Sequence, residues 1–169
     1  MRPERRVSSK AFNKFESFVH AGFGICRYQL ELQDCLAGIF RAHELKFLDF
    51  KTFNVNEYRK HERVENGDFN WIIPKQFIAF GDPETYAGTL GVPVSFFVKY
   101  FRKKNIGLVI RLNLSTYESS NFTDVGIEHR DLIYPDGSIP SEYIVREFLS
   151  LCESTIAKNY SVAVHCKGK

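Results

Sequence analysis

The sequence has 169 residues, of which 44% are hydrophobic, and a net charge of +3. This length fits one domain, or one domain with part of another, and the composition can form an ordinary globular core. The mild charge predicts no nucleic-acid partner, and the sequence contains no apolar run near the ~20 residues that a membrane span needs.

The cysteines predict an intracellular protein without a metal site. Cys26, Cys35, Cys152 and Cys166 form no C-x-x-C pair and no disulfide or zinc pattern. We therefore expect no cofactor, and reduced thiols in the nucleus and cytoplasm. Residues 1–14 are basic, which indicates a mobile tail or, alternatively, a nuclear-targeting segment. Their composition predicts no secretory signal.

The first half of the chain predicts two helices. The first covers residues 32–45, and its predicted packing face consists of Leu32, Leu36, Ile39, Phe40 and His43. Residues 49–65 alternate charged and apolar side chains, which predicts a linker helix capped by Asn54 with Glu57 three residues later. Glu-Asn-Gly-Asp at residues 65–68 is a strong turn signal, so we place a domain boundary there.

From Phe69 onward the pattern is that of an α/β domain. Strands are expected at residues 69–73, 76–80, 108–112, 127–134 and 160–165. A helix opening at Pro93 and a helix with Ser138 as its cap and Pro140 in its first turn separate them, and residues 115–125 are a loop or an irregular helix. This alternation predicts a parallel-rich sheet flanked by helices.

The last strand ends in a pattern suited to phosphate chemistry. Val162, Ala163 and Val164 form a buried strand that would deliver His165 and Cys166 to the carboxyl end of the sheet, where open α/β folds place ligands. Lys167 and Gly168 would begin a turning loop whose backbone N–H groups hold a phosphate. A cysteine in such a field attacks as a thiolate. Taken alone, the same pattern also fits a buried structural cysteine.

A cysteine that attacks phosphorus needs a proton donor for the leaving oxygen. Asp136 follows a predicted strand in a Pro-Asp-Gly turn, one helix before the Cys166 strand. That spacing returns the chain to the same sheet edge, so Asp136 is the candidate general acid. Its alternative is an ordinary turn aspartate.

Together these residues resemble a known family. The sequence is similar to the mitotic-exit dual-specificity protein phosphatases of the cell-division-cycle fourteen type, within the cysteine-dependent protein tyrosine phosphatase superfamily. The similarity covers about residues 12–167, in consistent order. The matching motifs include Glu62-Arg-Val-Glu-Asn-Gly-Asp68, Asn70-Trp-Ile-Ile-Pro74, Ile110-Arg-Leu-Asn113, Phe122-Thr-Asp124, Asp136-Gly-Ser138 and Ala163-Val-His-Cys-Lys167.

The resemblance implies two tandem phosphatase-like domains. Residues 15–53 would end the non-catalytic first domain, residues 54–68 would form the linker helix, and residues 69–169 would be the N-terminal half of the catalytic domain. Cys166 would be the nucleophile and Asp136 the general acid, with His165, Lys167 and Gly168 in the phosphate loop. The implied partners are proteins phosphorylated by proline-directed kinases in cell-cycle control. Phosphoserine-proline sites would be preferred over other phosphorylated residues.

Substrate binding is also implied, with departures from the family pattern. Glu62 and Asp68 match acidic groove residues that receive a basic substrate residue, whereas Arg59 replaces a third, which would weaken that preference. The loop arginine and the helix after it are absent from the sequence. We therefore expect an inactive fragment, incomplete at its C-terminus, because losing one stabilising donor costs on the order of 10²–10³ in rate.

Two other classes of protein remain as alternatives. A non-catalytic pseudophosphatase could bind phosphoproteins or regulate an active copy. A rhodanese-type sulfur transferase also carries a cysteine loop after a strand, but it needs no acid at Asp136 and leaves the Asn-Trp-Ile-Ile-Pro motif unexplained.

Overall fold

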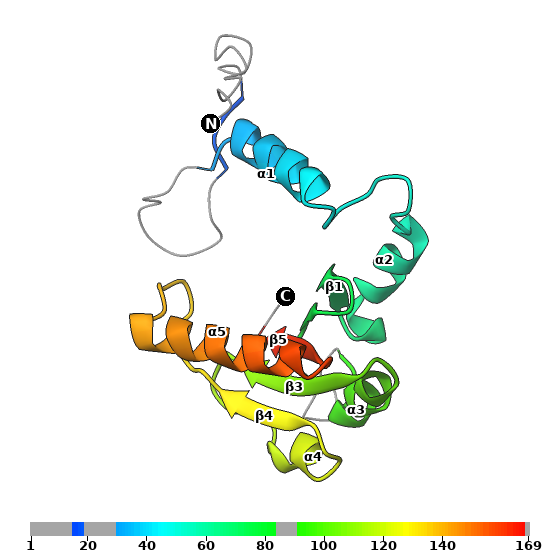
Figure 1. Cartoon of the computed structure of the whole chain (residues 1–169), viewed down its shortest axis with the longest axis vertical. Helices are drawn as coiled ribbons and strands as arrows, with labels where there is room; N and C mark the ends of the chain where they lie inside the picture. Colours follow the sequence, from blue (N-terminus) through cyan, green and yellow to red (C-terminus); the bar gives the residue numbers. More distant parts are fainter. Residues whose placement is uncertain (1–14, 19–29, 84–90, 168–169) are drawn as a thin grey trace. The chain divides into compact units, whose positions relative to one another are not determined.

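The computed structural model describes residues 15–18, 30–83 and 91–167 (Figure 1). The chain divides into two compact units, Met1–Phe53 and Asn54–Lys169. The basic tail predicted at residues 1–14 lies outside the described residues. Among those that are described, no helix has the length and apolar character needed to cross a membrane.

The first unit is built on helix α1, Leu32–Glu44, close to the predicted range. Its start is stabilised by a reciprocal capping box, in which the Glu31 backbone N–H donates to Asp34 Oδ2 at 2.9 Å. The prediction of a packing face was wrong, because no residue of α1 is buried and Phe40 is 63% exposed. The helix is amphipathic, but described residues do not bury its apolar side.

The second unit begins with helix α2, Val55–His61, and the one-turn 3₁₀ helix η2, Val64–Asn66. Asn54 caps α2 as predicted, since its Oδ1 accepts from the Glu57 backbone N–H at 3.0 Å. The helix is shorter than the predicted 49–65 because Asn54 is extended, as an N-cap must be. The predicted turn is confirmed by positive φ angles of 102° at Gly67 and 41° at Asp68.

Five strands form one sheet in the order β1-β2-β5-β3-β4. Their ranges are β1 Phe69–Ile73, β2 Phe77–Phe80, β3 Ile106–Arg111, β4 Glu128–Asp131 and β5 Ser161–His165. The β1–β2 pair is antiparallel and the other three pairs are parallel. The parallel-rich α/β sheet is therefore confirmed, with β5 at its centre.

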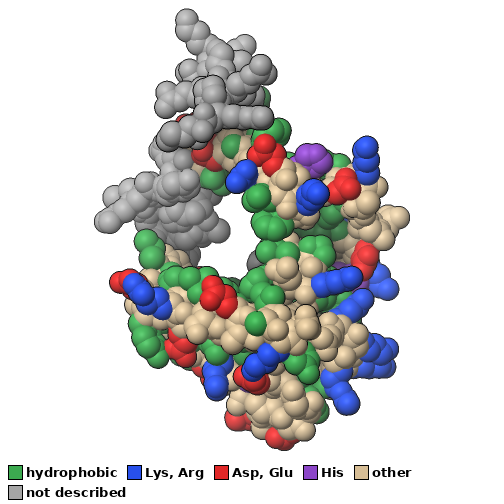
Figure 2. Space-filling model, in the orientation of Figure 1, with side chains coloured by type: hydrophobic (Ala, Val, Ile, Leu, Met, Phe, Trp, Pro, Cys, Tyr) green, Lys and Arg blue, Asp and Glu red, His purple; other side chains and the backbone are tan. Residues whose placement is uncertain are grey.

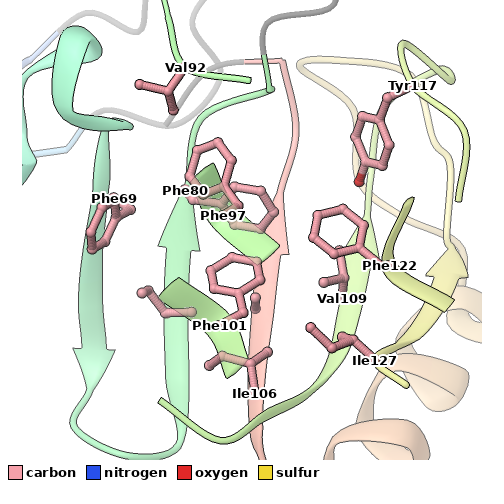
Figure 3. Close-up of a cluster of buried hydrophobic side chains, with 12 residues drawn as sticks. Phe69, Phe80, Val92, Phe97, Phe101, Ile106, Val109, Tyr117, Phe122 and Ile127 are labelled. Atoms are coloured by element: carbon pink, nitrogen blue, oxygen red, sulfur yellow. The ribbon is translucent and has the colours of Figure 1, made fainter. Parts of the chain in front are cut away.

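Helices cover both faces of this sheet. Helices α3, Val94–Lys103, and α4, Ser120–Thr123, pack on the first face, where Phe97, Phe101 and Phe122 meet strand side chains (Figure 3). Helix α5, Glu142–Ala157, packs on the second. Side chains alternate between these faces along each strand, so one strand supplies both layers.

Helix α3 forms where the sequence predicts it, and helix α5 differs from the prediction at its start. Helix α3 ends with Arg102 and Lys103, and Lys and Arg side chains gather on that side of the unit (Figure 2). Helix α5 is capped by Ser141, whose Oγ accepts from the Ile144 N–H at 3.4 Å, so the predicted cap at Ser138 was wrong. Ser138 instead donates to the Pro135 carbonyl inside the turn, and Pro140 precedes the helix.

Candidate active site

Strand register brings the candidate residues to one edge of the sheet. Adjacent strands align a single transverse row of residues, which consists of Phe69, Phe80, His165, Arg111 and Asp131. Strands β2, β5 and β3, which carry the middle of this row, are parallel, so the segments that follow them leave the sheet at the same edge. Cys166 is the first residue beyond the row on the central strand.

Cys166 and Cys152 lie in opposite environments. Cys166 is exposed and follows β5, whereas Cys152 is buried on α5 and only 3% exposed. Burial raises the pKa of the Cys152 thiol to about 11, which keeps it protonated at neutral pH. Of these two thiols, only Cys166 is accessible to a substrate.

His165 lies directly beneath this edge with a relative exposure of 3%. Its Nδ1 lies 3.1 Å from the Cys166 carbonyl oxygen, and its Nε2 lies 2.7 Å from the Tyr117 hydroxyl. The ring also packs against Phe80 in a tilted arrangement, with a centroid distance of 4.5 Å and an interplanar angle of 43°. Burial lowers the pKa of His165 to about 4, so the imidazole is neutral at physiological pH.

Arg111 forms a second buried polar centre beside His165. Its Nε and Nη2 donate to the two carboxylate oxygens of Asp131 at 2.7 and 3.0 Å, and its Nη1 donates to the Tyr117 carbonyl at 2.7 Å. The guanidinium also lies over the Tyr117 ring, 4.6 Å from its centroid. This bidentate pair fixes the loop that carries Tyr117 against the sheet.

Asp82 supports the same edge from the end of β2. Its carboxylate accepts from Thr116 Oγ1 at 2.8 Å and from Asn113 Nδ2 at 3.2 Å, and Oδ1 lies 3.6 Å from His165 Nδ1. Burial raises the pKa of Asp82, while these hydrogen bonds oppose the rise. The contacts join the segments that follow β2 and β3 on either side of Cys166.

Asp136 lies in the exposed turn that follows β4, where Gly137 has a φ of 69°. Strand β3 lies between β4 and β5. At the usual spacing of about 4.8 Å per strand, β4 is therefore about 10 Å from β5. The topology brings Asp136 to the same edge as Cys166, and its role as general acid stays a prediction.

The predicted substrate-binding residues lie on the other flank. Asp68 precedes β1 and accepts from the Gly81 N–H at 2.8 Å through its backbone carbonyl. Exposed Glu62 follows His61, whose ring packs against Phe69 in a tilted arrangement with centroids 4.3 Å apart. Arg59 is exposed on α2. Their contact with substrate stays a prediction. Lys167 is exposed beside Cys166, and Gly168 lies outside the described residues.

Sequence reasoning missed the buried polar residues around His165. Arg111 ends an otherwise apolar strand, and His129 and Asp131 alternate on β4, so both point to one face. A charged residue within a buried strand needs a partner, and an acidic residue on the neighbouring strand could have been sought. What the sequence did not contain was the register that pairs Arg111 with Asp131.

The proteins that this chain resembles are phosphatases. A family model described as a polymorphic toxin system DSP-PTPase phosphatase matches residues 92–169. Among solved structures, PTPMT1 in complex with PI(5)P superposes with a TM-score of 0.49 at 16% identity, over 59% of this chain and 62% of that one.

Curated relatives are more specific. The human dual specificity protein phosphatase CDC14A is 48% identical over 155 residues, which cover 89% of this chain and 25% of that protein. The tyrosine-protein phosphatase CDC14 homolog of Schizosaccharomyces pombe is 38% identical over 161 residues, covering 90% of this chain and 30% of that protein. The chain belongs to the CDC14 family of dual-specificity phosphatases, and it spans about a quarter of the length of the human relative.

Proposed function

We propose that this chain supplies the nucleophile and part of the substrate groove of a protein phosphatase acting on phosphoserine, phosphothreonine and phosphotyrosine. The observation that carries the proposal is the position of Cys166, exposed at the end of the central parallel strand with its backbone carbonyl beside buried His165. The curated relatives named as dual-specificity phosphatases support it.

The proposed reaction has two steps. The Cys166 thiolate attacks phosphorus, an S–P bond forms, and the P–O bond to the substrate side chain breaks. Asp136 gives its proton to the departing oxygen. Water then attacks the cysteinyl phosphate and gives a proton to the Asp136 carboxylate. The S–P bond breaks, which releases inorganic phosphate and restores both the Cys166 thiolate and the Asp136 acid.

Substrate choice follows from the acidic flank of the site. We propose that Glu62 and Asp68 receive a basic residue downstream of a phosphoserine-proline site, as produced by proline-directed kinases in cell-cycle control. Arg59 is exposed on helix α2, which ends just before Glu62. Its positive charge would weaken this preference for a basic residue. Nuclear and cytoplasmic localisation is part of the same proposal.

The test uses the complete reading frame that contains residues 1–169, established by sequencing the transcript across the Lys169 codon. Phosphate release from phosphoserine-proline peptides is measured for the wild type, Cys166→Ser and Asp136→Asn. We expect no turnover for Cys166→Ser and a loss of about 10²–10⁴ for Asp136→Asn at neutral pH. Unchanged turnover of Cys166→Ser would refute the role of Cys166.

The second candidate is a non-catalytic protein that binds phosphoproteins. It is favoured if the reading frame ends at Lys169, because the sequence to that point has no loop arginine. Binding of the same phosphopeptides, measured by fluorescence anisotropy, separates the two candidates. Saturable binding without phosphate release supports the binding protein, and turnover that depends on Cys166 supports the enzyme.

A further inference from the structure

A buried chain of polar side chains leads from β4 to the backbone of Cys166. The Tyr117 hydroxyl lies 3.0 Å from His129 Nε2 and 2.7 Å from His165 Nε2. The three side chains are almost fully buried, with residue exposures of 6% for Tyr117, 8% for His129 and 3% for His165. The reaction proposed above uses neither Tyr117 nor His129.

The contact between His165 Nδ1 and the Cys166 carbonyl sets the direction of every hydrogen bond in this network. A carbonyl oxygen can only accept, so His165 Nδ1, 3.1 Å from the Cys166 carbonyl, must carry a hydrogen. Because burial lowers the pKa of His165 to about 4, the neutral ring has no second hydrogen, and Nε2 is an acceptor. The Tyr117 hydroxyl must therefore donate to His165 Nε2.

A hydroxyl has one hydrogen, so Tyr117 can engage His129 only as an acceptor. His129 must then carry its hydrogen on Nε2. Burial lowers the pKa of His129 as well, which leaves its Nδ1 without a hydrogen at neutral pH. The hydrogen bonds thus run in one direction, from His129 to Tyr117, to His165 and to the Cys166 carbonyl.

The charged groups around His129 are compatible with this assignment. Asp131 Oδ1 lies 3.9 Å from His129 Nδ1, but Arg111 already holds both oxygens of that carboxylate at 2.7 and 3.0 Å. Burial is the main cause that disfavours a second proton on His129 and lowers its pKa; the Asp131 charge opposes this effect, and the charges of Arg111 and Arg130 add to it. Next to His165, Asp82 Oδ1 lies 3.6 Å from Nδ1, which is too long for a hydrogen bond but places a negative charge on the side of an Nδ1 hydrogen.

We propose that His129 is a positioning residue: through Tyr117 it holds His165 in the tautomer whose Nδ1–H binds the Cys166 carbonyl. Without the His129 donor, Tyr117 could instead accept from His165 Nε2–H, and the hydrogen bond from His165 Nδ1 to the Cys166 carbonyl would be lost. The consequence for catalysis rests on the proposed phosphatase function, whereas the tautomer assignment does not.

The test is ¹⁵N NMR of the full chain labelled at histidine, at pH 7, where the two ring nitrogens report which one carries hydrogen. In the wild type we expect hydrogen on Nδ1 of His165 and on Nε2 of His129. Hydrogen on Nδ1 of His129, or on Nε2 of His165, would overturn the proposal without any variant being made.

Two substitutions then test the coupling. His129→Phe removes the donor, and we expect the minor Nε2–H form of His165 to rise roughly fivefold, the effect of one lost hydrogen bond. His129→Gln keeps an N–H near the same place and should restore the wild-type pattern. A purely structural His129 predicts no tautomer change in a folded His129→Phe chain, and that result would contradict us.

Activity measurements separate this proposal from the previous one. In the complete reading frame, His129→Phe should lower kcat more than it raises KM, with rescue by His129→Gln. If the expected tautomers are found but the wild type shows no turnover, the phosphatase proposal fails and the positioning network stands. If turnover depends on Cys166 but the tautomers differ from those expected, the phosphatase proposal stands and the positioning role of His129 is refuted.

Discussion

At the scale of single residues, burial of neutral His165 couples folding to pH. An unfolded histidine titrates near 6.5, whereas burial lowers the pKa of His165 to about 4. Between these pH values the unfolded state binds more protons than the folded state, so stability falls as pH falls. Above pH 6.5 neither state binds the proton and this contribution is constant.

We therefore expect the free energy of unfolding to drop by about 3 kcal/mol between pH 6.5 and pH 4 through His165 alone. Lowering of the His129 pKa acts in the same direction. Urea unfolding at several pH values measures the slope. His165→Asn removes the titrating ring and should flatten the curve; an equally steep curve in that variant would disprove the assignment.

The Arg111–Asp131 pair is the second residue-scale feature. The Arg111 side chain is only 3% exposed, so Asp131→Ala leaves a buried guanidinium without its bidentate partner. We expect a loss of about 2–3 kcal/mol in unfolding free energy, measured by urea denaturation. Arg146→Ala, which removes a pair whose side chains are 77% and 78% exposed, is the control and should have little effect.

At the scale of elements, the start of β3 depends on a glycine. A Cβ placed on Gly107 would lie 2.7 Å from Cβ and Cγ of Tyr160, at the segment that leads into β5. The β3–β5 pair carries the row that presents Cys166, so a displacement here reaches the site. Gly107 is thus required for the close approach of β3 to Tyr160, and not because its backbone is left-handed.

Gly107→Ala should destabilise the chain by about 1–3 kcal/mol, since Tyr160 can move only by shifting the strand. Thermal unfolding followed by circular dichroism measures the change. The matched control is Gly38→Ala in α1, where a Cβ has nothing within 4 Å and should stabilise the helix slightly. A Gly107→Ala chain as stable as the wild type would show that the strands accommodate the methyl group.

At the scale of the whole molecule, apolar side chains reach the surface of both units (Figure 2). Phe40 on α1 is 63% exposed, and Ile139 and Tyr143 near the start of α5 are 92% and 72% exposed. Exposed apolar surface of this kind favours association.

We expect the chain to self-associate at micromolar concentration, and Phe40→Glu to reduce that association without lowering the midpoint of unfolding. Sedimentation velocity measures the first effect and urea denaturation the second. Ala37→Glu, an equal change of charge at an exposed position of the same helix, is the control. A clean monomer with a sharp cooperative transition in the wild type would contradict the expectation.

The local elements were predictable because their signals are local. The alternation of strands and helices after Phe69, the cap at Asn54 and the strand that leads to Cys166 all follow from neighbours within a few residues. The ends of elements were less well predicted. Ser141, and not Ser138, caps α5, because the Ser138 hydroxyl donates to the Pro135 carbonyl within the preceding turn.

The sequence by itself determined the fold class, the family and the two candidate catalytic residues, Cys166 and Asp136, since these depend on local pattern and on motifs in order. Only the tertiary structure decided that Arg111 pairs with Asp131 and that Tyr117 joins His129 to His165. Such contacts depend on strand order and register, which bring residues 12 to 48 positions apart within hydrogen-bonding distance.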